Sequence, residues 1–490
     1  MWMANAEEGM AIMFIGRGKE LDNLEKRWKK GSFECVVVYG RRRIGKTTLI
    51  RRFCEGRPAI FTSAIESSIG ENLKIIDAAV ALYATGVDIS DSAAGFPDFE
   101  AALETIFRLA QRERIIWVID EYPYLAQSDP SVSSRLQHAI DRYKDNSKLM
   151  LILSGSGMSV MERQVLGYKS PLYGRRTSQM KIEPFDFLES LEYLKGMDAE
   201  EGAAVYGITN GIPQYLAQFD PAVTLADNIR DNVIDTSAFL FEEPMNLMQQ
   251  ELRKPMEYNN VIRAIASGHS RLKEIATASH MDTSLLVSYV NNLIDLGIVG
   301  RQTPFGHEKS RRPLYHIVDG FFRFWYSLVA PRLSLIQAGQ IDLAMNGIMA
   351  AMPRFMGPVF ENMCRQWLWS CNGADEPLPF PIAEMGRWWG PDPASHRQEE
   401  IDIVARGLDE HDGASRGMLF CECKWRNGLV GMEELELLRR RATLLHPEEA
   451  YYCLFSKGGF DQTLRDAAAA DGRISLVSFA DMTERPLRPR

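Results

Sequence analysis

The feature that most constrains this chain is the loop GRRRIGKT at residues 40–47. It follows an apolar run from Cys35 to Tyr39 and leads directly into the segment TLIRRF, which reads as a helix. The spacing is G-x-x-x-x-G-K-[ST], in which backbone N–H groups and a helix N-terminus surround phosphate oxygens. The sequence therefore predicts a phosphate-binding loop between a strand and a helix of an α/β sheet.

Each position of this loop has an expected role. Lys46 would reach the β- and γ-phosphates of ATP, and the Thr47 hydroxyl would ligate Mg²⁺. The rest of the loop is expected to bind the nucleotide: Gly40, Arg41, Arg42, Arg43, Ile44, Gly45 and Thr48. The alternative is a glycine-rich turn with no ligand.

A second apolar run, RIIWVIDEYPYL, ends in Asp120 and Glu121. Parallel strands buried on both faces have this composition, and ligands bind at their carboxyl ends. Asp120 is expected to help hold Mg²⁺, directly or through water, and Glu121 to polarise the attacking water. The alternative is an acidic pair in a solvated loop. A third run, KLMLILSGSGMSV, ends in Ser154 and Ser156, and we expect Ser154 to sense the γ-phosphate, although serine is also common in turns.

Residues 14 to about 230 carry a series of segments in a recognisable order: FIGRGKEL, VVVYGRRRIGKTTLI, WVIDEYPYL, LILSGS, SPLYGRRT, EPFDFLE and GIPQYL. This series resembles the archaeal-type ATPase family, which is similar to AAA+ and STAND-type P-loop ATPases. The resemblance implies that Gly16 and Arg17 border the adenine pocket. It also implies that Pro213 belongs to a helical lid that touches the nucleotide.

The middle of the chain predicts a winged helix. Residues 259–300 show three amphipathic helical segments, and the segment after them reads as two strands with a basic tip at Lys309, Arg311 and Arg312. Residues 259–330 contain eight Lys or Arg against five Asp or Glu, a net +3 in a chain of net charge −9. This reversal favours DNA contact. In STAND-type ATPases the same fold also relays nucleotide state or binds protein, so both functions stay open.

Strand and helix patterns alternate in the last third. In GMLFCECKW the period of two places Phe420, Glu422 and Lys424 on one strand face and the cysteines on the other. A hairpin with the preceding strand, EEIDIVARG, would bring Asp402 near Glu422. Glu361 lies on a predicted helix upstream.

This arrangement resembles the PD-(D/E)XK nuclease fold and a C-terminal domain often attached to archaeal-type ATPases. The resemblance implies that Glu361, Asp402 and Glu422 hold Mg²⁺ and that Lys424 orients a water for phosphodiester cleavage. The chain departs from the pattern because Glu400-Ile401-Asp402 lacks the Pro-Asp dipeptide. The alternative is a non-cleaving domain that keeps the cluster as a salt bridge.

The predicted architecture is an α/β P-loop sheet with a helical lid, a winged helix-turn-helix and a C-terminal α/β restriction-endonuclease-like domain. The expected boundaries are 1–183, 184–245, 246–335 and 336–490. No run of 18 apolar residues and no secretory signal is evident, so we expect a cytoplasmic protein without membrane contact. The expected partners are ATP and DNA, with a homo-oligomer or a protein partner also possible.

Overall fold

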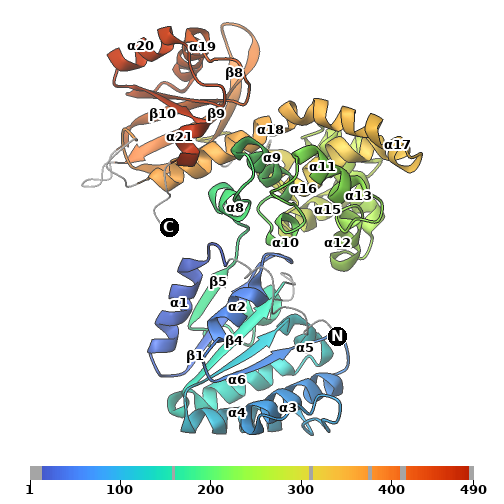
Figure 1. Cartoon of the computed structure of the whole chain (residues 1–490). Coiled ribbons are helices and arrows are strands. Elements are labelled where there is room, and N and C mark those ends of the chain that lie inside the picture. Colours follow the sequence, from blue (N-terminus) through green and yellow to red (C-terminus); the bar gives the residue numbers. More distant parts are fainter. Residues whose placement is uncertain (1–13, 157–160, 308–312, 373–377, 409–414, 485–490) are drawn as a thin grey trace. The chain divides into compact units, whose positions relative to one another are not determined.

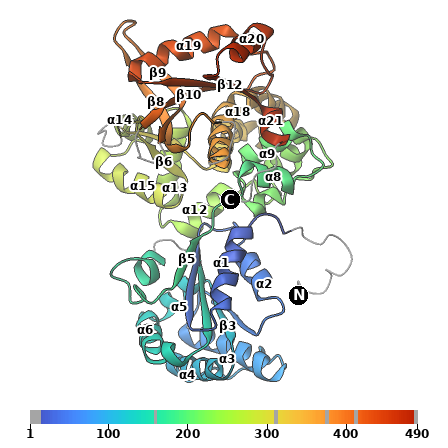
Figure 2. The same ribbon diagram turned by 90° about the vertical axis from the view of Figure 1, so that its left-hand side faces the viewer.

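The structure is a computed structural model that describes residues 14–156, 161–307, 313–372, 378–408 and 415–484 (Figures 1 and 2). The chain forms two compact units. The first comprises residues 14–184 with 212–214, and the second comprises residues 185–211 and those from 215 onward. The four domain boundaries expected from the sequence stay a prediction. The basic wing tip at 309–312 lies outside the described residues.

The first unit is built on one five-stranded parallel sheet in the order β2-β3-β4-β1-β5. Its strands are β1 (Glu34–Tyr39), β2 (Ala59–Ser63), β3 (Ile115–Asp120), β4 (Leu149–Gly155) and β5 (Ser178–Lys181). Its helices are α1 (Gly18–Lys29), α2 (Lys46–Cys54), α3 (Ile69–Thr85), α4 (Phe99–Arg112), α5 (Tyr122–Ser128) and α6 (Val132–Tyr143). Two single-turn helices follow, η1 (Lys144–Asn146) and η2 (Glu162–Leu166). The predicted α/β P-loop fold is confirmed.

The sheet is buried on both faces because its central strands are apolar along most of their length. Alternate residues of β3 enter different clusters: Trp117 packs with helices α3 to α6, and Val118 packs with α1 and α2. Successive side chains of β1 also lie on opposite faces, with Val37 in the cluster of Trp117 and Val38 in the cluster of Val118. This two-sided burial leaves the carboxyl ends of the strands as the place where polar side chains gather.

The second unit begins with helical segments. They are α8 (Phe187–Tyr193), α9 (Ala199–Thr209), α11 (Leu225–Ile229), η3 (Arg230–Ile234), α12 (Glu243–Glu251), α13 (Pro255–Ala266), α14 (Leu272–Ser279) and α15 (Thr283–Asp295). The short helix α10 (Pro213–Leu216) starts in the first unit. After α15, strands β6 (Val299–Gln302) and β7 (Leu314–Ile317) pair antiparallel. Three helices followed by a two-stranded sheet is the order of elements that a winged helix requires.

A helical connection leads to the last sheet. It consists of α16 (Gly320–Phe324), η4 (Trp325–Val329), η5 (Ala330–Arg332), α17 (Leu333–Gln337) and α18 (Ile341–Cys371). The sheet has the order β12-β11-β10-β9-β8. Its elements are β8 (Ile382–Asp392), β9 (Arg397–Leu408), β10 (Ser415–Lys424), α19 (Met432–Ala442), η6 (Thr443–Leu445), β11 (Ala450–Ser456), α20 (Gln462–Ala470), β12 (Ile474–Ser478) and α21 (Phe479–Glu484).

This second sheet is mixed and covered on two sides. Strands β8, β9 and β10 are antiparallel to one another, and β10, β11 and β12 are parallel. Phe420 packs with Leu435 and Leu438 of α19 on one face. On the other face the Trp425 ring lies 5.1 Å from the Phe360 ring of α18. The alternation expected for GMLFCECKW is therefore present.

None of the helices that the structure describes is long and apolar enough to span a bilayer. The longest, α18, carries Pro353 and Pro358 within it. All seven cysteines of the chain are free thiols.

Candidate nucleotide site and C-terminal carboxylate cluster

The loop between β1 and α2 adopts a conformation that its glycines permit. Gly45, which precedes the first residue of α2, has φ of 84°. Gly40 has φ of 149°, and a Cβ there would lie 2.4 Å from the backbone oxygen of Ile182. Only glycine fits such a close approach, so the loop can turn tightly and point its N–H groups to one centre.

Lys46 begins α2 and folds back over the loop. Its Nζ donates hydrogen bonds to the Gly40 oxygen at 3.1 Å and to the Arg41 oxygen at 2.8 Å. The residue is 5% exposed, so its ammonium group sits at the loop rather than in solvent. Its charge therefore lies beside the N–H groups that would hold phosphate.

Thr47 and Asp120 meet across the sheet. The Thr47 hydroxyl donates to Asp120 Oδ2 at 2.7 Å, which joins the first turn of α2 to the end of β3. Strand β4 separates β1 from β3, so these two residues come together only at the carboxyl edge. A hydroxyl and a carboxylate oxygen are ligands that Mg²⁺ prefers, and this pair fits the ion expected there.

Glu121 follows directly after β3 in a left-handed conformation, with φ of 50°. Both of its carboxylate oxygens accept from the Ser156 hydroxyl, each at 3.1 Å. Ser154 is different, because it is 0% exposed and its hydroxyl has no hydrogen-bond partner among the described residues. The serine that touches the candidate catalytic carboxylate is thus Ser156.

The remaining predicted residues surround the same loop. Arg17 has φ of 62°, follows Gly16 with φ of 63°, and donates to the Ile44 oxygen at 3.1 Å. Pro213 opens α10, and the N–H of the next residue, Gln214, donates to the Arg43 oxygen at 3.4 Å. Arg42 donates to the Tyr124 hydroxyl at 3.0 Å, and Thr48 is exposed on α2.

The C-terminal carboxylates gather where β9 and β10 stop pairing. The ladder ends with Cys421 opposite Ile403, and beyond it the Cys423 N–H donates to Asp402 Oδ2 at 2.9 Å. Lys424 Nζ lies 2.7 Å from Glu422 Oε1. The hairpin therefore places Asp402 next to the Glu-x-Lys strand.

Burial works against ionisation in this cluster. It raises the pKa of Asp402 to about 6, and the nearby charge of Glu361 adds to the effect. Burial is also the main reason for the raised pKa of Glu422, followed by the charge of Asp402. The pKa of Glu361 is raised by burial too. The three carboxyl groups thus repel one another's charge in a region of low solvation.

Comparison with known proteins identifies the family. An uncharacterised protein of Methanocaldococcus jannaschii is 35% identical over 451 residues, which cover 91% of this chain and 96% of that protein. Residues 14–219 match the family described as an ATPase domain predominantly from Archaea. This chain belongs to that ATPase family. The expected family membership is confirmed, and the match includes the whole loop, Asp120 and Glu121.

Other similarities agree with this assignment. Residues 325–440 of the ATPase match a family described as archaeal and bacterial proteins of unknown function. An uncharacterised ATP-binding protein of the same organism is 44% identical over 46 residues, 9% of this chain and 78% of that protein. The structure of the Walker-type ATPase PABY2304 of Pyrococcus abyssi has a TM-score of 0.50 at 20% identity, covering 64% of this chain and 96% of that one. At this identity the likeness concerns the fold.

Two members of the ATPase site have no strong signal in the sequence. Ser156 lies one residue beyond the last residue of β4, and the exact end of that strand decides whether Ser154 or Ser156 reaches Glu121. Tyr124 is a second example, because it contacts Arg42 only through the turn that opens α5. The segment SGS was the available signal, and it did not separate the two serines.

The C-terminal cluster of the ATPase is held by internal cations. Besides Lys424, Arg441 NH1 lies 3.3 Å from Glu422 Oε2, so both oxygens of this carboxylate face a cation. Arg439 and Arg440 also have acidic partners, Asp471 and Asp392. In the described parts of the chain, no group of three or more His, Cys, Asp or Glu side chains is arranged to hold a metal ion. Mg²⁺ binding by Glu361, Asp402 and Glu422 stays a prediction, and Glu422 already has Lys424 and Arg441 as cationic partners.

Proposed function

We propose that this ATPase binds ATP with Mg²⁺ at the loop of residues 40–47 and hydrolyses it. The observation that carries the proposal is the pairing of two carboxylates with two hydroxyls at one sheet edge. The Thr47 hydroxyl donates a hydrogen bond to Asp120 Oδ2 at 2.7 Å, and the Ser156 hydroxyl donates one to Glu121 Oε1 at 3.1 Å. A protein that only binds nucleotide needs the first pair, and a hydrolase needs the second as well.

Different residues of the loop and the sheet edge have different roles in phosphoryl transfer. Backbone N–H groups of the loop and of the start of α2 bind the phosphates, and Lys46 neutralises charge on the β- and γ-oxygens. When bound, Mg²⁺ supplies further charge neutralisation at these oxygens. Thr47 and Asp120 would hold it, the hydroxyl as a ligand and the carboxylate directly or through water.

Glu121 is the candidate base that orients the attacking water. Its left-handed backbone turns the carboxylate away from the strand direction, and the Ser156 hydroxyl fixes both of its oxygens. A carboxylate held by a neutral donor keeps its negative charge available to accept a hydrogen bond from water. A carboxylate paired with an ammonium group would lose much of that capacity.

Replacing Glu121→Gln tests hydrolysis separately from binding. We expect ATP affinity to remain within about threefold and the hydrolysis rate to fall about a hundredfold or more, because only the water-orienting charge is removed. Binding is followed by calorimetry and hydrolysis by phosphate release. The matched control is Glu100→Gln, an exposed position on α4. Full hydrolysis by Glu121→Gln would refute the role of this carboxylate.

We further propose that α13 to α15 with β6 and β7 bind DNA. The helix α15 exposes hydroxyl and amide side chains (Thr283, Ser284, Ser288, Asn291 and Asn292) and contains no Lys or Arg. Such groups can read base edges, while phosphate contacts would come from Lys273 of α14 and from the basic wing. Binding to duplex DNA that weakens steeply with salt supports this proposal, and salt-independent or absent binding contradicts it.

For the C-terminal sheet we propose the non-cleaving alternative, in which Glu422 and Lys424 form part of an ion-pair network. Both oxygens of Glu422 have cationic partners, and this supports the alternative over phosphodiester cleavage through Glu361, Asp402 and Glu422. The test is incubation with single- and double-stranded DNA and with RNA, with and without ATP and Mg²⁺. Cleavage that disappears in Glu422→Gln would reverse the proposal in favour of a nuclease.

A further inference from the structure

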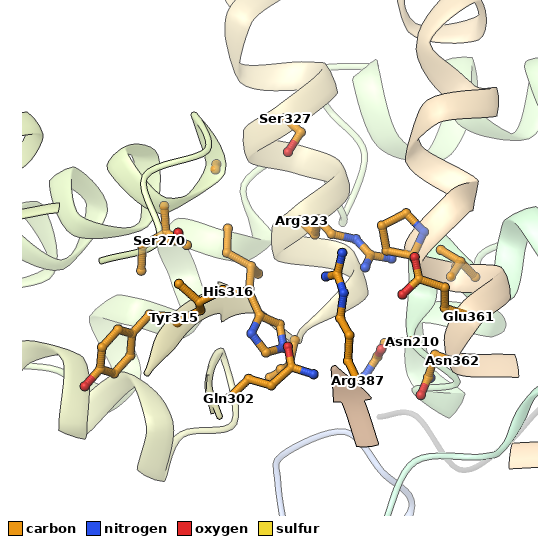
Figure 3. A pocket seen from close by; sticks show the side chains of 18 of the residues that line it. Asn210, Ser270, Gln302, Tyr315, His316, Arg323, Ser327, Glu361, Asn362 and Arg387 are labelled. Atoms are coloured by element: carbon orange, nitrogen blue, oxygen red, sulfur yellow. The ribbon is translucent and has the colours of Figure 1, made fainter. Parts of the chain in front are cut away.

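The second unit contains a cavity of about 510 Å³ that the nucleotide site does not use. Figure 3 shows side chains from several elements pointing into it. Its walls come from α9, the end of α13, both strands of the β6–β7 sheet, α16, α18 and β8. Four of its lining side chains carry a formal charge: Arg323, Arg365, Arg387 and Glu361.

Arg323 is the central cation of this cavity. Its guanidinium makes no hydrogen bond and no ion pair to any residue that the structure describes, and its Nε is buried. The group lies over the Phe355 ring, 4.8 Å from the centroid, which holds the side chain in place but satisfies none of its donors. A buried donor without an acceptor costs free energy, so an acceptor supplied from outside would stabilise the Nε of Arg323.

The other two arginines leave donors unused as well. Arg387 pairs with Glu400 at 2.7 Å through one nitrogen, but its buried Nε has no partner within the described chain. Arg365 lies 3.9 Å from Glu361, at the limit of an ion pair. The carboxylates that act on Arg323 are Glu361 and Asp319, and those that act on Arg387 are Glu361, Glu400 and Asp402. The case for an anionic ligand therefore rests on the buried Nε donors of Arg323 and Arg387, which have no acceptor among the described residues.

His316 shows the effect of this charge. The residue is solvent-accessible, but partial desolvation of its ring lowers its pKa to about 4, and the positive charges of Arg365, Arg323 and Arg387 contribute to the shift. The imidazole is therefore neutral at pH 7 and offers one N–H donor without adding charge. The amides of Asn210 and Gln302 extend the polar part of the wall (Figure 3).

We propose that this cavity binds a small molecule that carries a phosphate monoester. Donors approach from α16, α18, β7 and β8, and a tetrahedral phosphate with three terminal oxygens can accept from more directions than a planar carboxylate can. The volume exceeds what one phosphate group fills and lies within the usual range for small-molecule sites, so the ligand has an organic body. Ile265, Ile317 and Val359 give that body an apolar wall.

The proposal is independent of ATP hydrolysis, because the phosphate-binding loop belongs to the first unit and the cavity to the second. The test therefore uses the full chain with Lys46→Ala, which weakens the loop, in a buffer without Mg²⁺. The probes are inorganic phosphate, which reports on the anion subsite, and adenosine 5′-monophosphate, which adds an organic body. Binding is measured by isothermal titration calorimetry.

In this background we expect saturable binding of one equivalent of phosphate, and tighter binding of the monophosphate ester. Arg323→Met keeps an apolar stem over Phe355 and removes the charge, so affinity should fall roughly tenfold or more. The matched control is Arg354→Met, an exposed arginine of α18, which should bind as the parent does. Glu361→Gln removes an acidic wall residue and should tighten phosphate binding.

A purely structural role for Arg323 would not produce opposite effects in Arg323→Met and Glu361→Gln. A second measurement needs no substitution. The protein is treated with phenylglyoxal, which modifies arginine, with and without phosphate, and mass spectrometry locates the modified residues. Phosphate should protect Arg323 from modification. The proposal is overturned if neither probe binds at millimolar concentration, or if Arg323→Met binds as tightly as Arg354→Met.

Discussion

The two carboxylate sites of this protein are built from similar residues but differ in what surrounds them. At the end of β3, Asp120 and Glu121 accept hydrogen bonds from Thr47 and Ser156, and neither makes an ion pair with a described residue. At the end of β10, Glu422 is enclosed by Lys424 and Arg441. A carboxylate that accepts hydrogen bonds from neutral hydroxyls can still attract an incoming cation or accept a hydrogen bond from water. A carboxylate paired with internal cations attracts a further cation less strongly.

The same difference appears in the pKa values. The C-terminal carboxyls have raised pKa values because burial and mutual repulsion exceed the attraction of the arginines and the lysine. Cations inside the protein therefore compensate the cluster only in part. The first site is expected to respond to nucleotide and Mg²⁺, and the second to pH and to loss of its own cations.

The largest expected effect concerns the first site. Lys46→Ala should lower ATP hydrolysis about a hundredfold or more and weaken ATP binding, because the loop loses the charge that neutralises the phosphates. Phosphate release and calorimetry measure the two effects. Lys26→Ala, an exposed lysine on α1, is the control. An unchanged hydrolysis rate in Lys46→Ala would remove the distinction between the two sites.

Next in size is the loss of the internal cation at the second site. Lys424→Met should destabilise the protein by about 1–3 kcal/mol, less than a fully buried pair would, because Lys424 is 26% exposed while Glu422 is 6% exposed. Denaturant unfolding measures the change, with the exposed Arg397→Met as control. The double variant Glu422→Gln with Lys424→Met should recover part of the loss. Equal stabilities of Lys424→Met and Arg397→Met would argue against an ion-pair network.

Asp402 gives the second site a pH dependence with a defined sign. Its pKa is raised from 3.8 to about 6 in the folded protein, so the folded state binds a proton more tightly than the unfolded state does. Stability from this group is therefore highest below pH 3.8 and falls as pH rises to about 6, after which it is constant. Asp402→Asn, which keeps an acceptor for the Cys423 N–H, should add about 1–2 kcal/mol at pH 7.

Thermal unfolding at several pH values between 4 and 7 measures the difference in stability between Asp402→Asn and the parent protein. This difference should become smaller as the pH falls. The control is Asp466→Asn, an exposed position on α20. If Asp402→Asn destabilises the protein at pH 7, the ionised carboxylate stabilises the folded state, and the raised pKa of Asp402 would be contradicted.

The smallest expected effect distinguishes two serines of the first site. Ser156→Ala should slow hydrolysis about tenfold with little change in ATP affinity, because Glu121 loses the donor that orients it. Ser154→Ala removes a buried hydroxyl without a partner among the described residues, so the rate should stay the same and stability should not fall. A slower Ser154→Ala with a normal Ser156→Ala would restore the role that the sequence assigned to Ser154.

The sequence by itself determined the parallel sheet, the loop and the family. The spacing of Gly40, Gly45 and Lys46 constrains the local backbone, and the apolar run before Asp120 has the composition of a strand buried on both faces, which the structure confirms. These features depend on neighbours in the chain, so they are readable without the fold. The alternation of Glu422 and Cys423 was readable for the same reason.

Only the tertiary structure decided which partner each polar group has. Thr47 and Asp120 are 73 residues apart, and Ser156 meets Glu121 across 35 residues, so strand order rather than local sequence brings them together. The same holds for Arg441, which lies on α19, the helix that packs on β10, and forms an ion pair with Glu422. Whether a carboxylate is free for a ligand depends on these long-range neighbours, since charge and burial act through space and not along the chain.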